Sequence, residues 1–413
     1  MNSWASVAIP PLDEGFHVPA LHIFDTAAQE ITQVQVKSVY RMYVCGITPY
    51  DATHLGHANT YLAFDLLHRY LLATGAVVKF VQNITDIDDP LLERAIRDGI
   101  DWQDLATSQI DLFRSDMVAL HVLPPDHYIG AVEAIPLVVE AIAALDAADS
   151  VYKVDDDLYF RVRNDSEFGR RSHLSQDQML KTFSERGGDP DRLGKSDPLD
   201  ALLWLAQRPS EPGWDSKYGL GRPGWHIECC AIALNYLDID SSSKTSIDFQ
   251  GGGSDLIFPH HEMSAAQSKV INGKEFASHY VHAGMIGLDG EKMSKSKGNL
   301  VFVSKLISEG VDAMVIRTAL LSHHYRSDHM WDNAELVSAE FFLDELRVAL
   351  SRPEVAPTSS TIDQIINSLS QDLNTPQAIS ALKTWIKATN DGEVGGSPGE
   401  LSRAIDALLG IAL

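Results

Sequence analysis

The stretch VYRMYVCGITPYDATHLGHANTYLAFDLLHRYLLATG, residues 39–75, decides the fold of this chain. Its first seven residues form a mainly apolar run that predicts a buried strand, and the segment from Thr53 to Gly75 has the apolar spacing of a helix. VVKFVQNI predicts a second strand, and DPLLERAIRDG, with Pro90 near its start, predicts a second helix. Strands and helices that alternate in this way are typical of a parallel sheet covered by helices. The sequence therefore predicts an α/β fold whose ligands bind at the carboxyl ends of the strands.

The rest of the chain divides by pattern and composition. After residue 150 the alternation gives way to a β-rich piece and then to a long polar stretch that we expect to be a structureless loop, which indicates a functional insertion. We expect six segments, in chain order: 1–38, a β-rich lead-in; 39–145, the first half of a Rossmann-like (HUP-type) parallel-sheet catalytic domain; 146–215, an inserted, connective-peptide-like α+β subdomain; 216–300, the second half of the catalytic domain; 301–350, a stem-contact-like helical region; and 351–413, a C-terminal α-helical domain.

Composition narrows the class of protein. The chain has 413 residues, of which 45% are hydrophobic and 22% charged, so we expect a globular protein of two or three domains. It has neither a basic apolar leader nor a run of 18 apolar residues, which argues against a secretory signal and a membrane span. Three cysteines are too few for a disulfide framework, so we expect a reducing, cytoplasmic setting. A net charge of -24 disfavours non-specific binding to nucleic acid or anionic membranes.

Two short motifs suggest a phosphate site. His54-Leu55-Gly56-His57 taken alone fits a histidine packed at the start of a helix. Its place after a strand adds a second interpretation, because free N–H groups and the helix dipole at that point favour an anion. KMSKS, residues 292–296, is either a solvated basic loop or a loop whose lysines close over a triphosphate.

Together the two motifs resemble the signatures of the class I aminoacyl-tRNA synthetases. That resemblance implies ATP binding with Mg²⁺ and attack of a carboxylate on the α-phosphate, which gives an aminoacyl adenylate. It assigns catalytic roles to His54, His57, Lys292 and Lys295.

Cys45, Cys229 and His260 are candidate metal ligands. From the residues alone, buried cysteines and a surface histidine explain them equally well, since free cysteine is often buried. The expected sheet supports the metal interpretation, because we expect all three residues to lie where strands of that sheet end. Cys230 is expected to face the other side of its element.

A longer resemblance supports the metal site. YVCG, NITDIDD, DPLDALLW, GRPGWHIEC, GGGSDLIFPHHE and DGEKMSKSKGN resemble, in this order over about residues 20–330, the cysteinyl-tRNA synthetase branch. That branch holds one Zn²⁺ per chain, here implied at Cys45, Cys229 and His260, and binds the substrate thiolate on it. Ser264 stands where the branch has a fourth ligand, a glutamate. This leaves a coordination site for a thiolate or water, with Glu262 and His261 as alternative protein ligands.

The resemblance also implies a pocket for the adenylate. Trp225 would pack on the substrate side chain, while threonines and Asp255 would hold its amino and carboxyl groups. Each polar residue also has a plain interpretation as a cap or turn, Gly251 to Gly253 as a tight turn, and Ile286 as core. The full implied set is Gly46, Ile47, Thr48, Thr60, Asn83, Ile84, Thr85, Trp225, Gly253, Ser254, Asp255 and Ile286.

The acceptor is suggested by chain length and by one further motif. From residue 333 onward the chain has 11 acidic and 5 basic residues, a net charge of -6, which is a poor surface for RNA phosphates. ERGGDP, residues 185–190, fits a plain turn, and it also resembles a signature of the cysteine:glucosaminyl-inositol ligases of mycothiol biosynthesis, which are shortened relatives of the synthetases. That resemblance implies an ATP-dependent ligase that joins L-cysteine to the amine of glucosaminyl-inositol in an amide bond and releases AMP and diphosphate. We expect the insertion to bind the acceptor.

Three alternatives stay open. A cysteinyl-tRNA synthetase without an anticodon-binding domain would use tRNA as the acceptor. An amide ligase of the pantothenate-synthetase type would share the histidine motif but leaves the two cysteines and His260 unexplained. A non-catalytic nucleotide-binding relative would not need both histidines and both lysines. For the ligase we expect a cytoplasmic monomer with no nucleic-acid or membrane partner.

Overall fold

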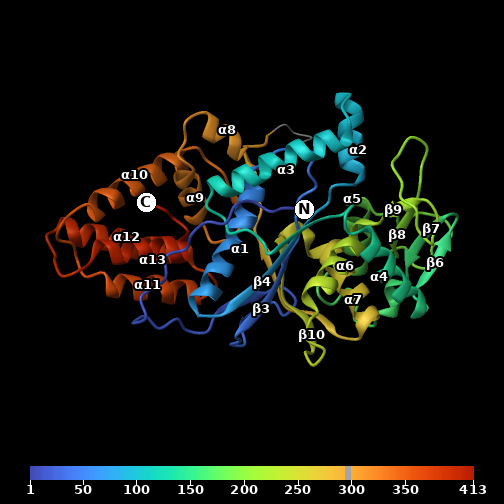
Figure 1. Cartoon of the computed structure of the whole chain (residues 1–413), viewed down its shortest axis with the longest axis horizontal. Coiled ribbons are helices and arrows are strands. Elements are labelled where there is room, and N and C mark those ends of the chain that lie inside the picture. Colours follow the sequence, from blue (N-terminus) through green and yellow to red (C-terminus); the bar gives the residue numbers. More distant parts are fainter. Residues whose placement is uncertain (294–298) are drawn as a thin grey trace.

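The computed structural model describes residues 1–293 and 299–413 and has a five-stranded parallel sheet at its centre (Figure 1). The strand order is β11-β10-β3-β4-β5, and each neighbouring pair is parallel. The predicted α/β fold is confirmed. The strands are β3 (Val39–Val44), β4 (Val77–Ile84), β5 (His127–Gly130), β10 (Thr245–Gly253) and β11 (Glu275–Ala283).

The expected strand–helix alternation is present at the start of the sheet. Helix α1 (Leu55–Ala73) follows β3 and packs on the sheet, and α2 (Asp89–Asp98) follows β4. The side chain of Asp88 accepts a hydrogen bond from the Asp89 N–H and caps α2, while proline stands in its first turn. α3 (Trp102–Ala119) then returns the chain to β5.

The insertion is a second, antiparallel sheet with its own small core. Its strand order is β6-β7-β8-β9, and it extends past residue 215. Our expectation of a structureless polar stretch is wrong, because this stretch contains α5 (Gln176–Glu185). Ser175 and Gln178 form a capping box at the start of α5, and its Met179 and Phe183 are buried. The remaining elements are α4 (Ile135–Ala147), β6 (Val151–Val154), β7 (Asp157–Phe160), β8 (Ala201–Ala206) and β9 (Gly221–Pro223).

After the insertion, α6 (Trp225–Leu237) and α7 (Glu262–Asn272) pack against each other and against the central sheet. A three-stranded sheet, β13-β12-β14, lies beyond β11 and includes Lys292. The tight turn considered for Gly251 to Gly253 is wrong: these glycines end strand β10. The short elements here are β1 (His22–Asp25), β2 (Glu30–Gln33), β12 (Ile286–Leu288), β13 (Glu291–Lys292) and β14 (His329–Met330).

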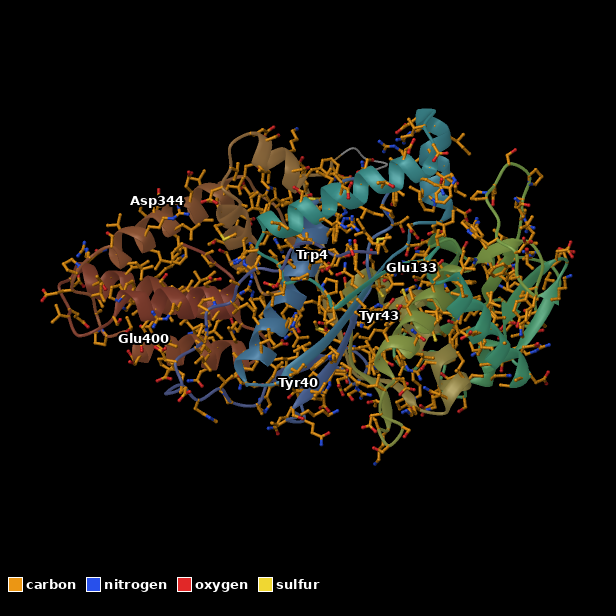
Figure 2. The ribbon with its side chains drawn as sticks, in the orientation of Figure 1. Trp4, Tyr40, Tyr43, Glu133, Asp344 and Glu400 are labelled. Carbon is orange, nitrogen blue, oxygen red and sulfur yellow. The ribbon has the colours of Figure 1, made fainter. Side chains whose placement is uncertain are left out.

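In residues 299–413 the structure has six helices, which lie at the opposite end of the molecule from the insertion (Figure 1). Asp344 and Glu400 stand on this end, while Tyr40 and Tyr43 lie on β3 in the centre (Figure 2). In residues 1–293 and 299–413, no helix has the length and apolar character to cross a membrane. The helices are α8 (Val303–Ser308), α9 (Ala313–Leu321), α10 (Ala334–Leu350), α11 (Ser359–Ser370), α12 (Thr375–Asn390) and α13 (Pro398–Leu409).

A buried ion cluster joins these helices to the sheet domain. Asp65 on α1 accepts hydrogen bonds from Arg69 and Arg317, and all three side chains are fully buried. Arg317 also donates to the carbonyl oxygens of Leu409 and Leu120, at 2.8 and 2.7 Å. Burial raises the pKa of Asp65, but the two arginines outweigh it and hold the pKa at about 2. The cluster therefore stays charged in neutral solution and ties the end of α13 to α1.

Arg317→Met should detach the C-terminal helices. It leaves Asp65 short of a buried partner and removes two bonds to backbone carbonyls, so we expect a loss of about 3–5 kcal/mol in the free energy of unfolding. Urea unfolding measures this loss, and hydrogen exchange should show it first in α13. The control is Arg347→Met, which breaks an exposed pair with Asp312 and should cost less than about 1 kcal/mol. Equal stability of the two variants would contradict a structural role for the buried cluster.

Candidate active site

The candidate site lies at the carboxyl edge of the central sheet. Cys45 directly follows β3, Thr85 directly follows β4, and β10 ends at Gly253. The Cys45 N–H donates to the Gly251 carbonyl at 3.0 Å, and the Thr85 N–H donates to the Ile47 carbonyl at 3.1 Å. The loops that follow these strands are therefore joined by backbone hydrogen bonds.

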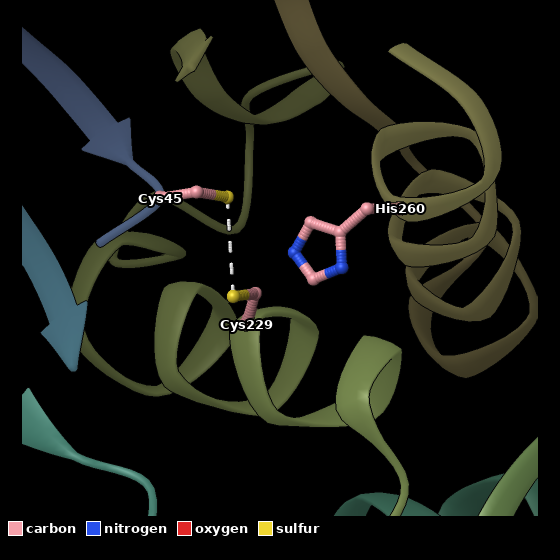
Figure 3. A group of neighbouring side chains, drawn as sticks. All are labelled: Cys45, Cys229 and His260. Atoms are coloured by element: carbon pink, nitrogen blue, oxygen red, sulfur yellow. Dashed lines mark hydrogen bonds between the residues drawn. The ribbon is translucent and has the colours of Figure 1, made fainter. Parts of the chain in front are cut away.

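The three candidate metal ligands come together in one buried cluster (Figure 3). The sulfur atoms of Cys45 and Cys229 are 3.9 Å apart, and with His260 all the ligand atoms lie within 4.8 Å of one another. The expectation that all three lie where strands end is wrong for Cys229, which lies inside α6. Cys229 reaches the cluster because α6 packs against β3 and β4. Cys230 joins a separate apolar cluster with Ile227, which confirms that it faces away.

The sulfur spacing fits a metal. With Zn–S bonds of about 2.3 Å, a tetrahedral site places two sulfurs about 3.8 Å apart, close to the observed 3.9 Å between Cys45 and Cys229. Burial raises the pKa of the Cys45 thiol. Burial also acts to raise the pKa of Cys229, but side-chain contacts with Cys45 and His260 lower it well below that of a free cysteine. The pair therefore favours a thiol beside a thiolate, which is the ionised form that a metal binds.

The orientation of His260 is held by its neighbours. Its Nδ1 lies 3.1 Å from Nδ1 of His226, and the ring of Trp225 stacks on it with ring centres 4.5 Å apart. The other ring nitrogen points toward the two sulfurs (Figure 3). The contact with His226 and the stacking of Trp225 thus fix the orientation of the His260 ring. Trp225 thus lies beside the cluster, as expected of a residue that packs on a substrate side chain.

A chain of hydrogen bonds leads away from Cys45. Nε2 of His261 lies 3.2 Å from the Cys45 sulfur, and Nδ1 of His261 lies 2.8 Å from Nε2 of His282. His282 in turn contacts the Thr26 hydroxyl at 2.8 Å. Burial lowers the pKa of His261 well below the usual value and that of His282 to about 3, so both rings are neutral.

The two alternatives for a fourth protein ligand differ in their contacts. Glu262 accepts hydrogen bonds at 2.9 Å from the Arg171 guanidinium and from the Ser172 N–H. Its carboxylate is therefore already paired with residues of the insertion. His261 does contact Cys45, while Ser264 donates to the His226 carbonyl at 3.1 Å. The ligand atoms of Cys45, Cys229 and His260 consequently converge without Glu262 or Ser264 among them.

The predicted phosphate motif forms the start of α1. Nδ1 of His54 accepts hydrogen bonds from the N–H groups of Gly56 and His57, at 3.1 and 3.4 Å, and so caps the helix. The rings of His54 and His57 stack with centres 3.8 Å apart, and both are partly exposed. This geometry places both rings at the positive end of the helix dipole.

The chain that follows residue 299 pairs with this motif. His54 pairs with Phe302 as an isolated bridge, and the Leu55 N–H donates to the Val301 carbonyl at 2.9 Å. Val301 and Phe302 therefore lie beside the start of α1. The side chain of Lys292 and the whole of Lys295 lie outside the described part of the chain, so their roles stay predictions.

The residues implied for the adenylate fall into two groups. Gly46, Asn83 and Thr85 are bonded to one another, because the Gly46 N–H donates to Asn83 Oδ1 at 2.8 Å and Asn83 Nδ2 donates to Thr85 Oγ1 at 3.2 Å. A Cβ at Gly46 would lie 1.7 Å from the Asn83 carbonyl oxygen, so only glycine fits this close approach. The second group follows β10 and faces α1: a Cβ at Gly253 would lie 2.6 Å from an Asp255 oxygen and 3.7 Å from Thr60 Oγ1.

The other members differ in exposure. Ile47, Ile84 and Ile286 are buried, at 4%, 0% and 1% exposed, so their side chains belong to the core. The residues that remain partly exposed at this edge are Thr48, Thr60, Trp225, Gly253, Ser254 and Asp255.

The motif ERGGDP links the insertion to the site. Arg186 donates to the carbonyl oxygens of Asp255 and Phe258, in the turn that carries His260. Gly187 has a φ of +84°, and Asp189 accepts a hydrogen bond from Lys195 at 2.9 Å. The motif thus forms a turn, which is its simpler interpretation. It also contacts the segment that carries His260.

Sequence reasoning missed the supporting histidines. His226 precedes Cys229 by three residues on a predicted apolar element, so a helical spacing there would have placed both on one face. His282 carries no such signal, because it lies on β11 and reaches the cluster only through sheet pairing.

The chain is similar to proteins of known family. The model of the tRNA synthetases class I (C) catalytic domain matches residues 30–340. Relatives named L-cysteine:1D-myo-inositol 2-amino-2-deoxy-alpha-D-glucopyranoside ligase from Thermomonospora curvata and Streptomyces coelicolor are each 52% identical, with 100% of both chains covered. A third so named, from Mycobacterium sp. strain KMS, is 51% identical and covers 100% of this chain and 99% of its own.

Solved structures agree on the fold. Mycobacterium tuberculosis methionyl-tRNA synthetase in complex with methionyl-adenylate has a TM-score of 0.62 at 17% identity and covers 91% of this chain and 89% of its own. An Agrobacterium radiobacter leucyl-tRNA synthetase complex has a TM-score of 0.60 at 11% identity, with 97% and 84% covered. The chain therefore belongs to the class I tRNA synthetase family and, within it, to the L-cysteine:1D-myo-inositol 2-amino-2-deoxy-alpha-D-glucopyranoside ligases.

Proposed function

We propose that this ligase activates L-cysteine with ATP and joins it to the amine of glucosaminyl-inositol, as a step of mycothiol biosynthesis. The observation that carries the proposal is the Cys45, Cys229 and His260 cluster, which stands at the same sheet edge as the histidine motif of α1. A thiol-selective site and a phosphate site at one edge suit a cysteinyl adenylate. The names of the full-length relatives support the amino-sugar as the acceptor.

The resident metal in this proposal is one Zn²⁺, held by Cys45, Cys229 and His260. Two sulfurs and one imidazole are the ligands that zinc prefers, and a site with three protein ligands leaves a position for substrate. When bound, the metal supplies a soft acid for the substrate thiolate and so separates cysteine from serine, which an apolar pocket would barely do. The neutral His261, in contact with the Cys45 sulfur, can share a proton there without adding charge.

The reaction then has two steps. ATP, with Mg²⁺, places its phosphates at His54, His57 and the positive end of α1, and the lysine loop covers them. A carboxylate oxygen of cysteine attacks the α-phosphorus, and diphosphate leaves. The acceptor amine next attacks the acyl carbon, the amide bond forms, AMP leaves with the bonding electron pair, and the amine loses a proton.

The acceptor distinguishes this proposal from a cysteinyl-tRNA synthetase. The surplus of acidic residues after residue 333 is unfavourable for RNA phosphates. Arg186 gives the insertion a direct link to the turn of Asp255, so we keep the insertion as the proposed acceptor region. Because the ligand thiols are free, we also propose a reducing, cytoplasmic setting, and we keep the monomer as a prediction.

Cysteine-dependent exchange of labelled diphosphate into ATP tests the first step. We expect exchange with L-cysteine alone, at least about 100-fold faster than with L-serine, because only the thiolate suits the metal. Addition of glucosaminyl-inositol should then give the amide and AMP, whereas tRNA should not be charged. Charging of tRNA without amide formation would reverse the acceptor assignment, and no exchange with cysteine would overturn the activation step.

Cys45→Ala tests the metal ligand. We expect the variant to lose about one equivalent of zinc and most of its preference for cysteine over serine. Metal analysis and the exchange assay measure the two effects. The matched control is Cys230→Ala, an equally buried neighbour that faces the other core and should keep its zinc. Full zinc in the Cys45 variant would rule out the ligand role.

His226→Leu tests the support of His260. Loss of the bond between the two Nδ1 atoms should weaken zinc binding by about 10–100-fold, since supporting partners orient metal-bound imidazoles. Competition with a chromogenic chelator measures the affinity. His226→Asn, which keeps a polar atom near Nδ1, should recover part of it. If both variants bind zinc like the wild type, His226 only fills space.

A further inference from the structure

A second cluster of metal-ligating side chains lies outside the candidate active site. It consists of His323, which follows α9, His329 on β14, and Glu335 in the first turn of α10. None of the three belongs to the Cys45 cluster or to the histidine motif of α1. We call it the His323–His329–Glu335 cluster.

The donor atoms of this cluster converge. One ligand atom from each residue lies within 4.8 Å of the other two. Nε2 of His323 is 3.0 Å from a carboxylate oxygen of Glu335, and the rings of His323 and His329 stack with centres 3.9 Å apart at an angle of 10°. A tetrahedral site with bonds of about 2.0–2.1 Å has donors about 3.3 Å apart, so the His323–Glu335 distance already fits.

The hydrogen bonding of the two ring nitrogens of His329 indicates a ligand. Its Nδ1 lies 3.4 Å from the Ser327 carbonyl oxygen, which is the contact that directs a lone pair to Nε2. In the part of the chain that the structure describes, Nε2 is itself buried and has no hydrogen-bond partner. A buried imidazole nitrogen without a partner is unfavourable unless something else satisfies it. A metal ion between the three residues would do so.

The chemistry of the donors selects the kind of ion. Two imidazoles and one carboxylate suit Zn²⁺ or Co²⁺, whereas Mg²⁺ and Ca²⁺ prefer oxygen ligands. His323 and Glu335 keep 34% and 19% of their side-chain surface exposed, so water can enter and complete the coordination. We propose that His323, His329 and Glu335 form a second, structural site for a divalent transition metal such as zinc.

The place of this site suggests what it stabilises. β14 pairs with β12, and β12 pairs with β13, the strand from which the KMSKS loop leaves. An ion held by His323, His329 and Glu335 joins the end of α9, strand β14 and the start of α10. It therefore fixes β13, through β12 and β14, against the ends of α9 and α10.

Counting bound metal tests the proposal. The full chain, stripped with a chelator and reloaded with Co²⁺ alone, should bind about two equivalents, and Cys45→Ala should bind about one. Cys45→Ala combined with His329→Ala should bind none, while Cys45→Ala combined with His17→Ala, the substitution of an exposed histidine elsewhere, should keep one. This count does not depend on activity, so it separates the second site from the proposed function.

A stability measurement guards against simple misfolding. His329→Ala removes one ligand but leaves the contact between His323 and Glu335, so the metal-free variant should melt close to the metal-free wild type. Added Co²⁺ should raise the melting temperature of Cys45→Ala and fail to raise that of the double variant. Equal metal content in Cys45→Ala with and without His329 would overturn the proposal, and so would the absence of any bound metal in Cys45→Ala.

Discussion

The parallel pairing of β3 between β4 and β10 is the constraint on which the rest of the structure depends. Because all three strands run the same way, their carboxyl ends meet at one edge, and every loop that follows them starts there. α1 has to begin near that edge, so the histidine motif stands at the same end of the sheet as Cys45. The pairing also demands small residues: a Cβ at Gly251 would lie 2.2 Å from the Phe64 ring, so α1 could not pack on β10 as closely.

The cluster of Cys45, Cys229 and His260 depends on a second layer of side chains around this edge. Its residues come from the end of β3, from α6 and from the turn after β10, and each contacts neighbours from other segments. His226 and Trp225 fix His260, while His261 and His282 extend from Cys45 as neutral, buried rings. Burial that lowers the pKa of a histidine keeps the charge of the cluster on sulfur, where a metal needs it.

The two end pieces of the molecule serve the centre in different ways. The insertion contacts the turn of the site through Arg186, and its own core keeps that contact in place. The C-terminal helices join α1 through buried arginines and share one apolar core with it. The centre is therefore supported on both sides, by the insertion and by the C-terminal helices.

The sequence by itself determined the alternation of strands and helices, because apolar spacing and caps such as Asp88 act locally. It also predicted that Cys45, Cys229 and His260 belong to one site, because their motifs resemble those of a known family, and the fold brings the three side chains together. It did not determine that Cys229 lies on a helix, that the polar stretch contains α5, or that His282 supports Cys45. Those facts follow only from tertiary structure, because sheet pairing and helix packing bring together residues far apart in the chain, and no local pattern records which faces meet. For the same reason, His323, His329 and Glu335 carry no common signal in the sequence. Only the fold brings them together as a cluster.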